Sequence, residues 1–398
     1  MLWILASVAF ALLCYEIPTL VAAVLWPLWN NPSALQTDFH YYYDAAHRFA
    51  AGGPLYLATD DVIAGFAYPP PAIVPFMVLA KLPLGAALLL QTLASYAALL
   101  VAVRLWFSYL RREGMAIAGS TELAATVIAV ALGPSYTNVM IGQVNAFVLV
   151  GSVAFVAFAP RLPPIAAFML ASGIWLKVYP ITLAAIGTWD RRAWRALAWT
   201  IVAAVVIAVS LLPLVPAAAY QSFFTEVLPS RTDKTAIHVT NQSLVAFLER
   251  FRYPSHQFLN WTGEQAVTVS GAVRSLNLLF AAAVVGLLWK RARQGQFARA
   301  TSAAGLMAMI AVIAPLGWGH TYVMVLPLML LHVIALQDAR PAVAVLVFAC
   351  VAALMIPAGR HLPVDTAPDW FANLVYSRYL IATVALLLLV LDTRHREA

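Results

Sequence analysis

The chain has 398 residues, of which 63% are hydrophobic and only 10% are charged, and its formal net charge is +7. Because soluble domains are only about half apolar, this composition excludes an ordinary soluble enzyme and predicts a protein embedded in membrane lipids. The basic residues cluster in short loops between apolar runs, as membrane topology demands, so the positive charge does not indicate a nucleic-acid partner. Both cysteines lie in apolar segments, which argues against a loop disulfide or a cysteine metal site.

Apolar runs long enough to cross a bilayer recur along almost the whole chain. The sequence therefore predicts an all-α polytopic membrane protein, a single membrane-embedded domain over 1–398 with about twelve transmembrane helices. The expected crossings are 2–27, 84–108, 120–138, 141–159, 163–176, 178–189, 194–214, 270–290, 301–316, 320–337, 341–357 and 374–391.

By the positive-inside rule the basic loops and both termini lie in the cytoplasm, which requires an even number of crossings. That number needs a helix break at Lys177–Pro180, where proline removes a backbone donor. It also needs the proline-rich segment 69–82 to be re-entrant or interfacial. If 69–82 crosses fully instead, the loop with Arg111 faces outward. In the first topology the loops 28–68 and 216–269 are extracytoplasmic.

The first outer loop, 28–68, carries four carboxylates, five tyrosines and two histidines. A carboxylate beside a bilayer costs free energy unless water or a partner takes it up, so the loop predicts a polar active site at the membrane surface. Asp38 is the candidate catalytic base, because partial burial among aromatic rings would raise its pKa and make it a better base. The alternative is a solvated acidic loop, which we favour for Asp44 and for an expected turn at Asp60 and Asp61.

Polar residues interrupt the apolar runs at two more places on the predicted outer face. Gln143 and Asn145, beside Gly142, offer donors and acceptors that suit sugar hydroxyls or a phosphate, and the alternative is a turn with a polar cap. Lys177 lies at the expected helix break, where its ammonium is a candidate to hold a lipid-linked phosphate. The alternative is a lysine that snorkels to the interface.

The long outer loop 216–269 carries cations and amides that are candidates to bind an anion or an acceptor, among them Arg231, Asn241 and Gln242. Within it, Leu244–Phe251 is amphipathic and is predicted to lie on the membrane surface.

The stretch Gly317–Tyr322 is expected to open a helix on the outer side. There Trp318 can stack on a sugar ring and His320 can donate to a phosphate oxygen. The alternative is an interfacial aromatic belt residue beside a capping histidine.

The sequence contains no Walker A loop, GxGxxG, HExxH, GxSxG or D-x-D motif. Nucleotide-driven transport and metal-dependent nucleotide-sugar chemistry therefore lose support, and no cofactor and no metal are predicted.

The order of these motifs resembles glycosyltransferase family 87, over residues of about 30 to 335. The family comprises membrane mannosyltransferases with the GT-C fold, including polyprenyl-phosphate-mannose-dependent enzymes of phosphatidylinositol mannoside synthesis. The motifs that carry the resemblance are Asp38-Phe-x-x-Tyr42-Tyr43, Leu55-Tyr56, Phe66-Ala-Tyr68-Pro69-Pro70, Gly142-Gln-x-Asn145, Lys177-x-Tyr-Pro180, Asn241-Gln-Ser243 and Gly319-His320.

The resemblance implies an inverting transfer on the extracytoplasmic face of the cell membrane. A sugar, typically mannose, would pass from a polyprenyl-phosphate donor to a lipid or glycan acceptor. The family's catalytic aspartate falls on Asp38, and its donor-phosphate contacts fall on Lys177 and His320. This chain has Gly-His-Thr where many relatives have two histidines, so no second histidine is assigned. The candidates for substrate binding are Tyr42, Tyr68, Gln143, Asn145, Asn241, Gln242 and Trp318.

A donor whose leaving group stays attached to its lipid predicts a groove that opens sideways to the bilayer, with the apolar segments near 69–82 as its expected lining. Two other functions stay open from the sequence. If the protein is a transporter or flippase of a lipid-linked or polar substrate, we expect an inverted repeat and charged residues near the bilayer midplane. If it is a scaffold, we expect no chemistry. Only the enzyme requires Asp38, Lys177 and His320 to meet at one cavity. The acceptor, the identity of the sugar and the oligomeric state are left open.

Overall fold

A computed structural model describes residues 1–30, 38–57, 65–191, 193–260, 265–360, 362–364 and 367–391. The expected turn at Asp60 and Asp61 lies outside the described residues. Within the described residues the chain is helical almost throughout, with one pair of short strands. The all-α prediction is therefore confirmed in outline.

Among the described residues, four helices are longer than eighteen residues. They are α1 (Leu2–Asn30), α4 (Leu84–Arg112), α9 (Ala193–Leu211) and α14 (Gly271–Ala292). By length and composition α4, α9 and α14 can each cross a membrane. Two bent pairs, α5 (Gly119–Ala131) with α6 (Gly133–Met140) and α18 (Asp369–Tyr376) with α19 (Arg378–Leu391), raise the number among the described residues to five.

The other apolar helices are shorter than a full crossing. They are α7 (Asn145–Phe158), α8 (Pro163–Leu176), α15 (Gln296–Ile313), α16 (Leu326–Ile334) and α17 (Pro341–Met355). The 3-10 helices η3 (Tyr179–Thr188), η5 (Gly319–Val325) and η6 (Ala335–Gln337) adjoin some of them. The number of about twelve crossings thus stays a prediction.

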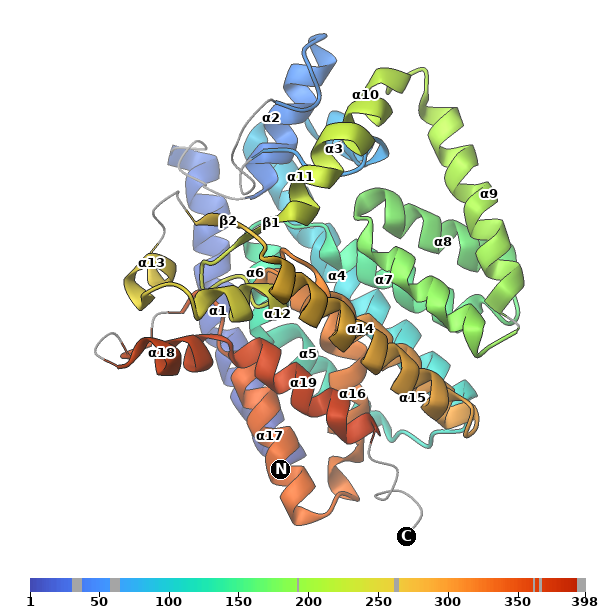
Figure 1. Cartoon of the computed structure of the whole chain (residues 1–398), viewed down its shortest axis with the longest axis vertical. Helices are drawn as coiled ribbons and strands as arrows, with labels where there is room; N and C mark the ends of the chain where they lie inside the picture. Colours follow the sequence, from blue (N-terminus) through green and yellow to red (C-terminus); the bar gives the residue numbers. More distant parts are fainter. Residues whose placement is uncertain are drawn as a thin grey trace.

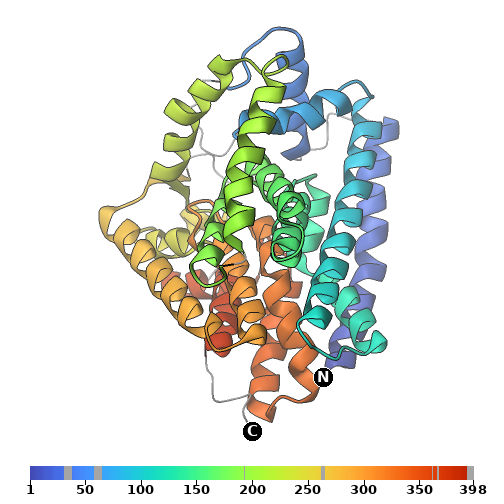
Figure 2. The ribbon, with the colours of Figure 1, turned by 90° about the vertical axis from the view of Figure 1, so that its right-hand side faces the viewer.

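The main hydrophobic core joins α1, α4, α5, α7, α15, α16, α17 and α19 (Figures 1 and 2). All nine residues of α16 are buried, as expected of a helix that is apolar on every side. By contrast, α9 and α14 expose large apolar side chains, such as Ile201 and Leu279. Such surfaces suit contact with lipid rather than water.

One end of the molecule, at the top of Figure 1, is built from short segments. They are α2 (Asp38–Ala50), η2 (Pro70–Ala72), α3 (Ile73–Leu79), α10 (Ala217–Ser222), the π-helix η4 (Phe223–Val227) and α11 (Leu228–Asp233). The start of α1 and the end of α19 lie toward the other end (Figure 2). Because η2 and α3 together span only Pro70–Leu79, this segment is too short to cross a bilayer.

A second, smaller core attaches this end to the bundle. In α2 the buried residues Phe39, Tyr42, Ala45 and Ala46 repeat at helical spacing and pack against α3 and the start of α4. The ring of Tyr42 lies 4.6 Å from that of Phe76, between ring centroids. This packing fixes the first residue of α2, Asp38, relative to the bundle.

The rest of the long loop forms β1 (Lys234–Ala236), α12 (Leu244–Arg250), α13 (Ser255–Leu259) and β2 (Ala266–Thr268), with Thr235 opposite Val267 in the antiparallel pair. The helix predicted over Leu244–Phe251 is present as α12, and its place on the membrane surface stays a prediction. The charged residues Glu249 and Arg250 are buried, and Phe251 is exposed, so α12 turns its charges inward.

Arg250 joins this region to α18 and to Ser377, which lies between α18 and α19. Its guanidinium donates to Asn373 Oδ1 at 2.7 Å, to Ser377 Oγ at 2.8 Å and to the carbonyl oxygen of Asn241 at 2.8 Å. All three acceptors are buried. Without the guanidinium, the Asn241 carbonyl oxygen and the Ser377 hydroxyl lose this donor, and Asn373 Oδ1 keeps only the Ser377 hydroxyl at 3.2 Å. A buried unsatisfied polar group is costly.

Replacing Arg250 by alanine is therefore expected to destabilise the protein by about 3 kcal/mol, since several charge-assisted hydrogen bonds are lost together. Unfolding of the purified protein in detergent measures the change. The control is Arg274→Ala, because Arg274 and Asp233 form an ion pair in which both side chains are about half exposed, and such pairs contribute at most about 1 kcal/mol. Equal, small effects of both substitutions would contradict the assignment.

Candidate functional site

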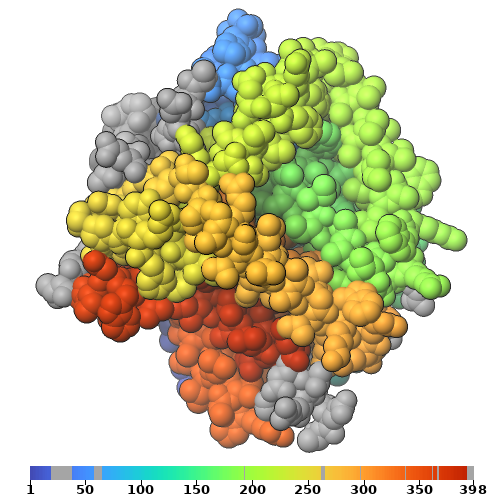
Figure 3. Space-filling view, viewed as in Figure 1, coloured from blue at the N-terminus to red at the C-terminus, as the bar shows by residue number. Residues whose placement is uncertain are grey.

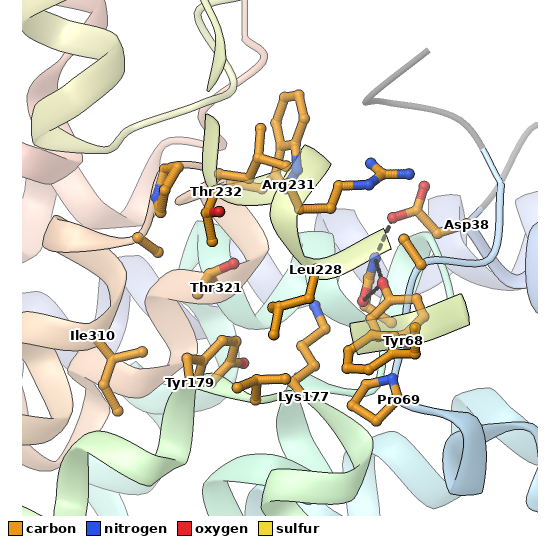
Figure 4. A pocket seen from close by; sticks show the side chains of 18 of the residues that line it. Asp38, Tyr68, Pro69, Lys177, Tyr179, Leu228, Arg231, Thr232, Ile310 and Thr321 are labelled. Atoms are coloured by element: carbon orange, nitrogen blue, oxygen red, sulfur yellow. Dashed lines mark hydrogen bonds between the residues drawn. The ribbon is translucent and has the colours of Figure 1, made fainter. Parts of the chain in front are cut away.

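A cavity of about 400 Å³ lies where α2, η3, α11 and the end of α15 meet. Figure 4 shows Asp38 and Tyr68 on one side, Lys177 and Tyr179 at the base, and Arg231 and Thr232 above. Ile310 lies on the side of the cavity away from Asp38 (Figure 4), and the lining also includes the apolar residues Ile313 and Leu316. A polar corner beside an apolar wall suits a ligand with a polar head and an apolar body.

Asp38 is held by a chain of polar side chains. The Gln143 amide donates to Asp38 Oδ2, and Tyr68 donates to Gln143 Oε1 at 3.3 Å. The Tyr68 hydroxyl also lies 2.6 Å from that of Tyr42. Burial raises the pKa of Asp38, while the Gln143 hydrogen bond and the charge of Lys177 act to lower it. A carboxylate in this setting is a stronger base than one in water, yet it can still ionise.

Gly142 permits this arrangement. Its φ is +72°, and a Cβ on it would lie 2.6 Å from the Cβ of Phe39, so a side chain has no room there. Phe39 in turn donates its backbone N–H to the carbonyl oxygen of Ile141 at 3.1 Å. The glycine turn between α6 and α7 therefore brings Gln143 against the first turn of α2.

Lys177 lies in the predicted helix break, after α8 ends at Leu176 and before η3 begins at Tyr179. Its ammonium lies 5.1 Å from the ring centroid of Tyr68 and 5.9 Å from that of Tyr179. Burial lowers the pKa of Lys177 to about 7, and the charge of Asp38 opposes that change. An anion placed beside the amine would restore its full charge, so the site favours anionic ligands.

Arg231, Trp318 and Thr321 line the same cavity. The guanidinium of Arg231 extends from α11 toward Asp38 (Figure 4). Trp318 precedes η5, as predicted, and its backbone forms a β-bridge with Asn241. The cavity thus has two cations, one carboxylate and several aromatic rings.

Asn145 and His320 are buried behind the cavity and do not line it. The Asn145 amide donates to the carbonyl oxygen of His320 at 3.2 Å and accepts from the Tyr179 hydroxyl at 2.6 Å. Asn145 therefore ties η5 to η3. This differs from the predicted direct roles of both residues, because their side chains are covered by neighbouring elements.

Asn241 and Gln242 also differ from the prediction. Both are fully buried. The Asn241 amide donates to the Ala236 and Pro315 carbonyl oxygens, at 2.9 and 3.1 Å, and the Gln242 amide donates to that of Tyr376 at 2.6 Å. Since these bonds use both amides, the two residues hold the loop on the bundle and are not open to a substrate.

Of the ten residues predicted for the site, the structure brings six together around the cavity: Asp38, Tyr42, Tyr68, Gln143, Lys177 and Trp318. Sequence reasoning missed Tyr179, Thr321 and Thr232, and it did not separate Arg231 from the other cations of its loop. Tyr179 could have been predicted as a site residue, because it lies in the helix break Lys177–Pro180. Within the described residues no group of three His, Cys, Asp or Glu side chains is placed to hold a metal ion.

The family model of Glycosyltransferase family 87 matches residues 66–315, which is more than half of the chain. The chain belongs to this family, and it is therefore a glycosyltransferase of a membrane family. The match includes Tyr68, Gln143 and Lys177, whereas Asp38 and His320 lie outside it. No curated protein matches the chain.

The hydrogen bond from Gln143 predicts a pH effect. Because the bond lowers the pKa of Asp38, Gln143→Leu is expected to raise that pKa further, so that Asp38 ionises only at higher pH. The acid limb of the pH profile of kcat/KM for glycosyl transfer should then move to higher pH. The control is Gln294→Leu, because the Gln294 amide oxygen accepts a hydrogen bond from Arg291 at the surface. An unmoved acid limb in Gln143→Leu would show that Asp38 does not set it.

Proposed function

We propose that the protein is an inverting glycosyltransferase that moves a sugar, mannose by family resemblance, from a polyprenyl phosphate to a hydroxyl of a lipid or glycan acceptor. We place the reaction on the extracytoplasmic face of the cell membrane. The observation that carries the proposal is the presence of Asp38 and Lys177 in one cavity that also has an apolar wall. A lipid-linked sugar phosphate needs all three features.

In the proposed reaction the acceptor oxygen forms a bond to the anomeric carbon as the bond from that carbon to the phosphate oxygen breaks. Asp38 takes the proton of the acceptor hydroxyl, and the electron pair leaves with the phosphate. A single displacement of this kind inverts the anomeric centre. General-base assistance contributes typically about 10²–10⁴-fold to a rate.

The departing phosphate gains negative charge, which cations placed in advance beside it stabilise. Lys177 supports this role because it lies at the base of the cavity. We assign the second cationic contact to Arg231, which lines the cavity, in place of His320, which does not. Trp318 and Tyr68 are the proposed stacking surfaces for the sugar ring.

The donor class is tested by incubating the purified protein with a panel of donors and reading the products by mass spectrometry. We expect transfer from polyprenyl-phosphate sugars, with polyprenyl-phosphate mannose the best, and none from nucleotide sugars. Transfer from nucleotide sugars alone would overturn the proposed donor class, because a nucleotide sugar has no lipid chain that could contact the apolar wall.

The role of Asp38 is tested by Asp38→Asn, which keeps the size of the side chain and removes the base. We expect kcat to fall about a thousandfold, within the range for loss of a general base, while donor binding is kept. Asp44→Asn is the matched control, because Asp44 lies in the same helix, is exposed, and is not part of the cavity lining. Equal activity of Asp38→Asn and the wild type would remove Asp38 from the mechanism.

A further inference from the structure

A second polar cavity, of about 180 Å³, lies at the other end of η3 from the proposed active site. Tyr179, the first residue of η3, lines the proposed active site, whereas Ile186 and Trp189 line the second cavity. A 3-10 helix of this length spans about 20 Å. The two cavities have no described lining residue in common, so they are separate sites. We call the second one the distal pocket.

The ends of four helices surround the distal pocket. The helices α4 and α7 end beside it, at Arg112 and Phe158, and α9 and α15 begin beside it, at Ala193 and Gln296. Figure 2 shows α4 running from the end of the molecule that carries α2 toward the opposite end. The loops that join these helices carry the basic residues that predict a cytoplasmic location. The distal pocket therefore lies at the predicted cytoplasmic end of the bundle.

The lining of the distal pocket combines two cations with two carboxylates. Arg161 follows α7, and Arg299 lies in the first turn of α15. Glu113 follows α4, and Asp190 follows η3. Within the part of the chain that the structure describes, Arg161, Arg299 and Glu113 form no ion pair. Their charges can therefore meet a ligand, and the four formal charges cancel.

Tyr109 presents a hydroxyl to the same pocket. The residue is only 6% exposed, and its ring packs on that of Trp106 with centroids 5.3 Å apart. Tyr109 lines the pocket, and among the described residues its hydroxyl has no hydrogen-bond partner. A tyrosine buried to this extent normally has a partner for its hydroxyl. Here a polar ligand in the pocket can supply that partner.

The charges and the size of the distal pocket define a class of ligand. Guanidinium groups bind phosphate oxygens through charge-assisted hydrogen bonds, and carboxylates beside the Trp189 indole suit an ammonium. Glu113 and Asp190 would repel a simple anion, and the two arginines would repel a simple cation. The volume of about 180 Å³ is below the roughly 300 Å³ of sites that enclose a whole small molecule. The pocket therefore suits a zwitterionic head group whose remainder lies outside.

The surface next to the distal pocket suits lipid chains. The helix α9 leaves the pocket at Ala193, and its residues Trp194, Trp199 and Ile201 are at least half exposed. The green surface on the right of Figure 3 includes α9. Tryptophan is enriched where lipid head groups meet the hydrocarbon, so Trp194 indicates that the mouth of the pocket lies at that level.

We propose that the distal pocket binds the head group of a zwitterionic phospholipid with a primary ammonium, of the phosphatidylethanolamine type. The lipid phosphate accepts hydrogen bonds from Arg161, Arg299 and the Tyr109 hydroxyl, and the ammonium donates to Glu113 and Asp190. The acyl chains follow the exposed apolar face of α9. Pockets between the ends of transmembrane helices are known to recognise lipid head groups by charge. The site takes no part in glycosyl transfer, and a lipid bound there joins the ends of four helices.

The test follows thermal unfolding of the purified, delipidated protein in detergent as phosphatidylethanolamine is added. A ligand that binds only the folded protein raises its unfolding temperature, and the dependence on concentration gives an apparent Kd. The variants are Arg299→Gln and Glu113→Gln, which each remove one charge from the lining. The control is Arg195→Gln, because Arg195 is exposed on α9 and is not part of the lining. Unfolding without lipid shows that each variant is folded.

We expect phosphatidylethanolamine to bind the wild type and Arg195→Gln equally, and Arg299→Gln about tenfold more weakly, which equals about 1.4 kcal/mol. In the wild type it should also bind about tenfold more tightly than phosphatidylcholine or phosphatidylglycerol. The methylated ammonium of the first of these cannot donate a hydrogen bond, and the second has no ammonium. Glu113→Gln should bind phosphatidylethanolamine and phosphatidylcholine alike, a loss of selectivity that general destabilisation does not produce.

Equal binding of all three lipids by the wild type would overturn the proposal, and so would wild-type binding by both Arg299→Gln and Glu113→Gln. Soluble glycerophosphoethanolamine that binds as tightly as the lipid would overturn the assignment to a membrane lipid. Because none of these measurements needs glycosyl transfer, failure here leaves the proposed function untouched. Equally, an absence of transfer activity would not bear on the distal pocket.

Discussion

The proposed site depends on one constraint: a partly buried carboxylate must stay ionisable. Asp38 meets it through two partners that come from distant parts of the chain, the amide of Gln143 and the charge of Lys177. Each partner reaches Asp38 because a helix ends beside it. If either were displaced, burial would favour the neutral acid, and a neutral acid cannot accept a proton.

The groups of the cavity stand at interruptions of helices. Asp38 begins α2, Gln143 stands between α6 and α7, Lys177 separates α8 from η3, and Trp318 precedes η5. Irregular backbone at membrane depth is tolerated only where it lines a cavity or is covered by protein. The same breaks that shorten the apolar helices therefore expose polar side chains at one place, and they explain why few helices have the full length of a crossing.

Much of this could be predicted from local sequence. The break after Leu176 follows from proline, and Asp38, Gln143 and Lys177 stand out because polar residues are rare in so apolar a chain. The sequence predicts Asn241 and Gln242 as substrate contacts, whereas in the structure they bond to Pro315 and Tyr376. These partners lie far away in the sequence and cannot be inferred from it. The choice of Arg231 among neighbouring cations depends on how η4 and α11 place it over the cavity. Such packing is set by tertiary contacts, which a local pattern does not contain.

The most direct test of the central claim is an experimental structure with a non-hydrolysable donor bound, such as a polyprenyl phosphonate analogue of the sugar phosphate. The account predicts that the phosphonate lies within hydrogen-bond distance, about 3 Å, of Lys177 Nζ, with the anomeric carbon facing Asp38 across an open space for the acceptor hydroxyl. A phosphonate bound away from Lys177, or an Asp38 carboxylate that points out of the occupied cavity, would contradict it.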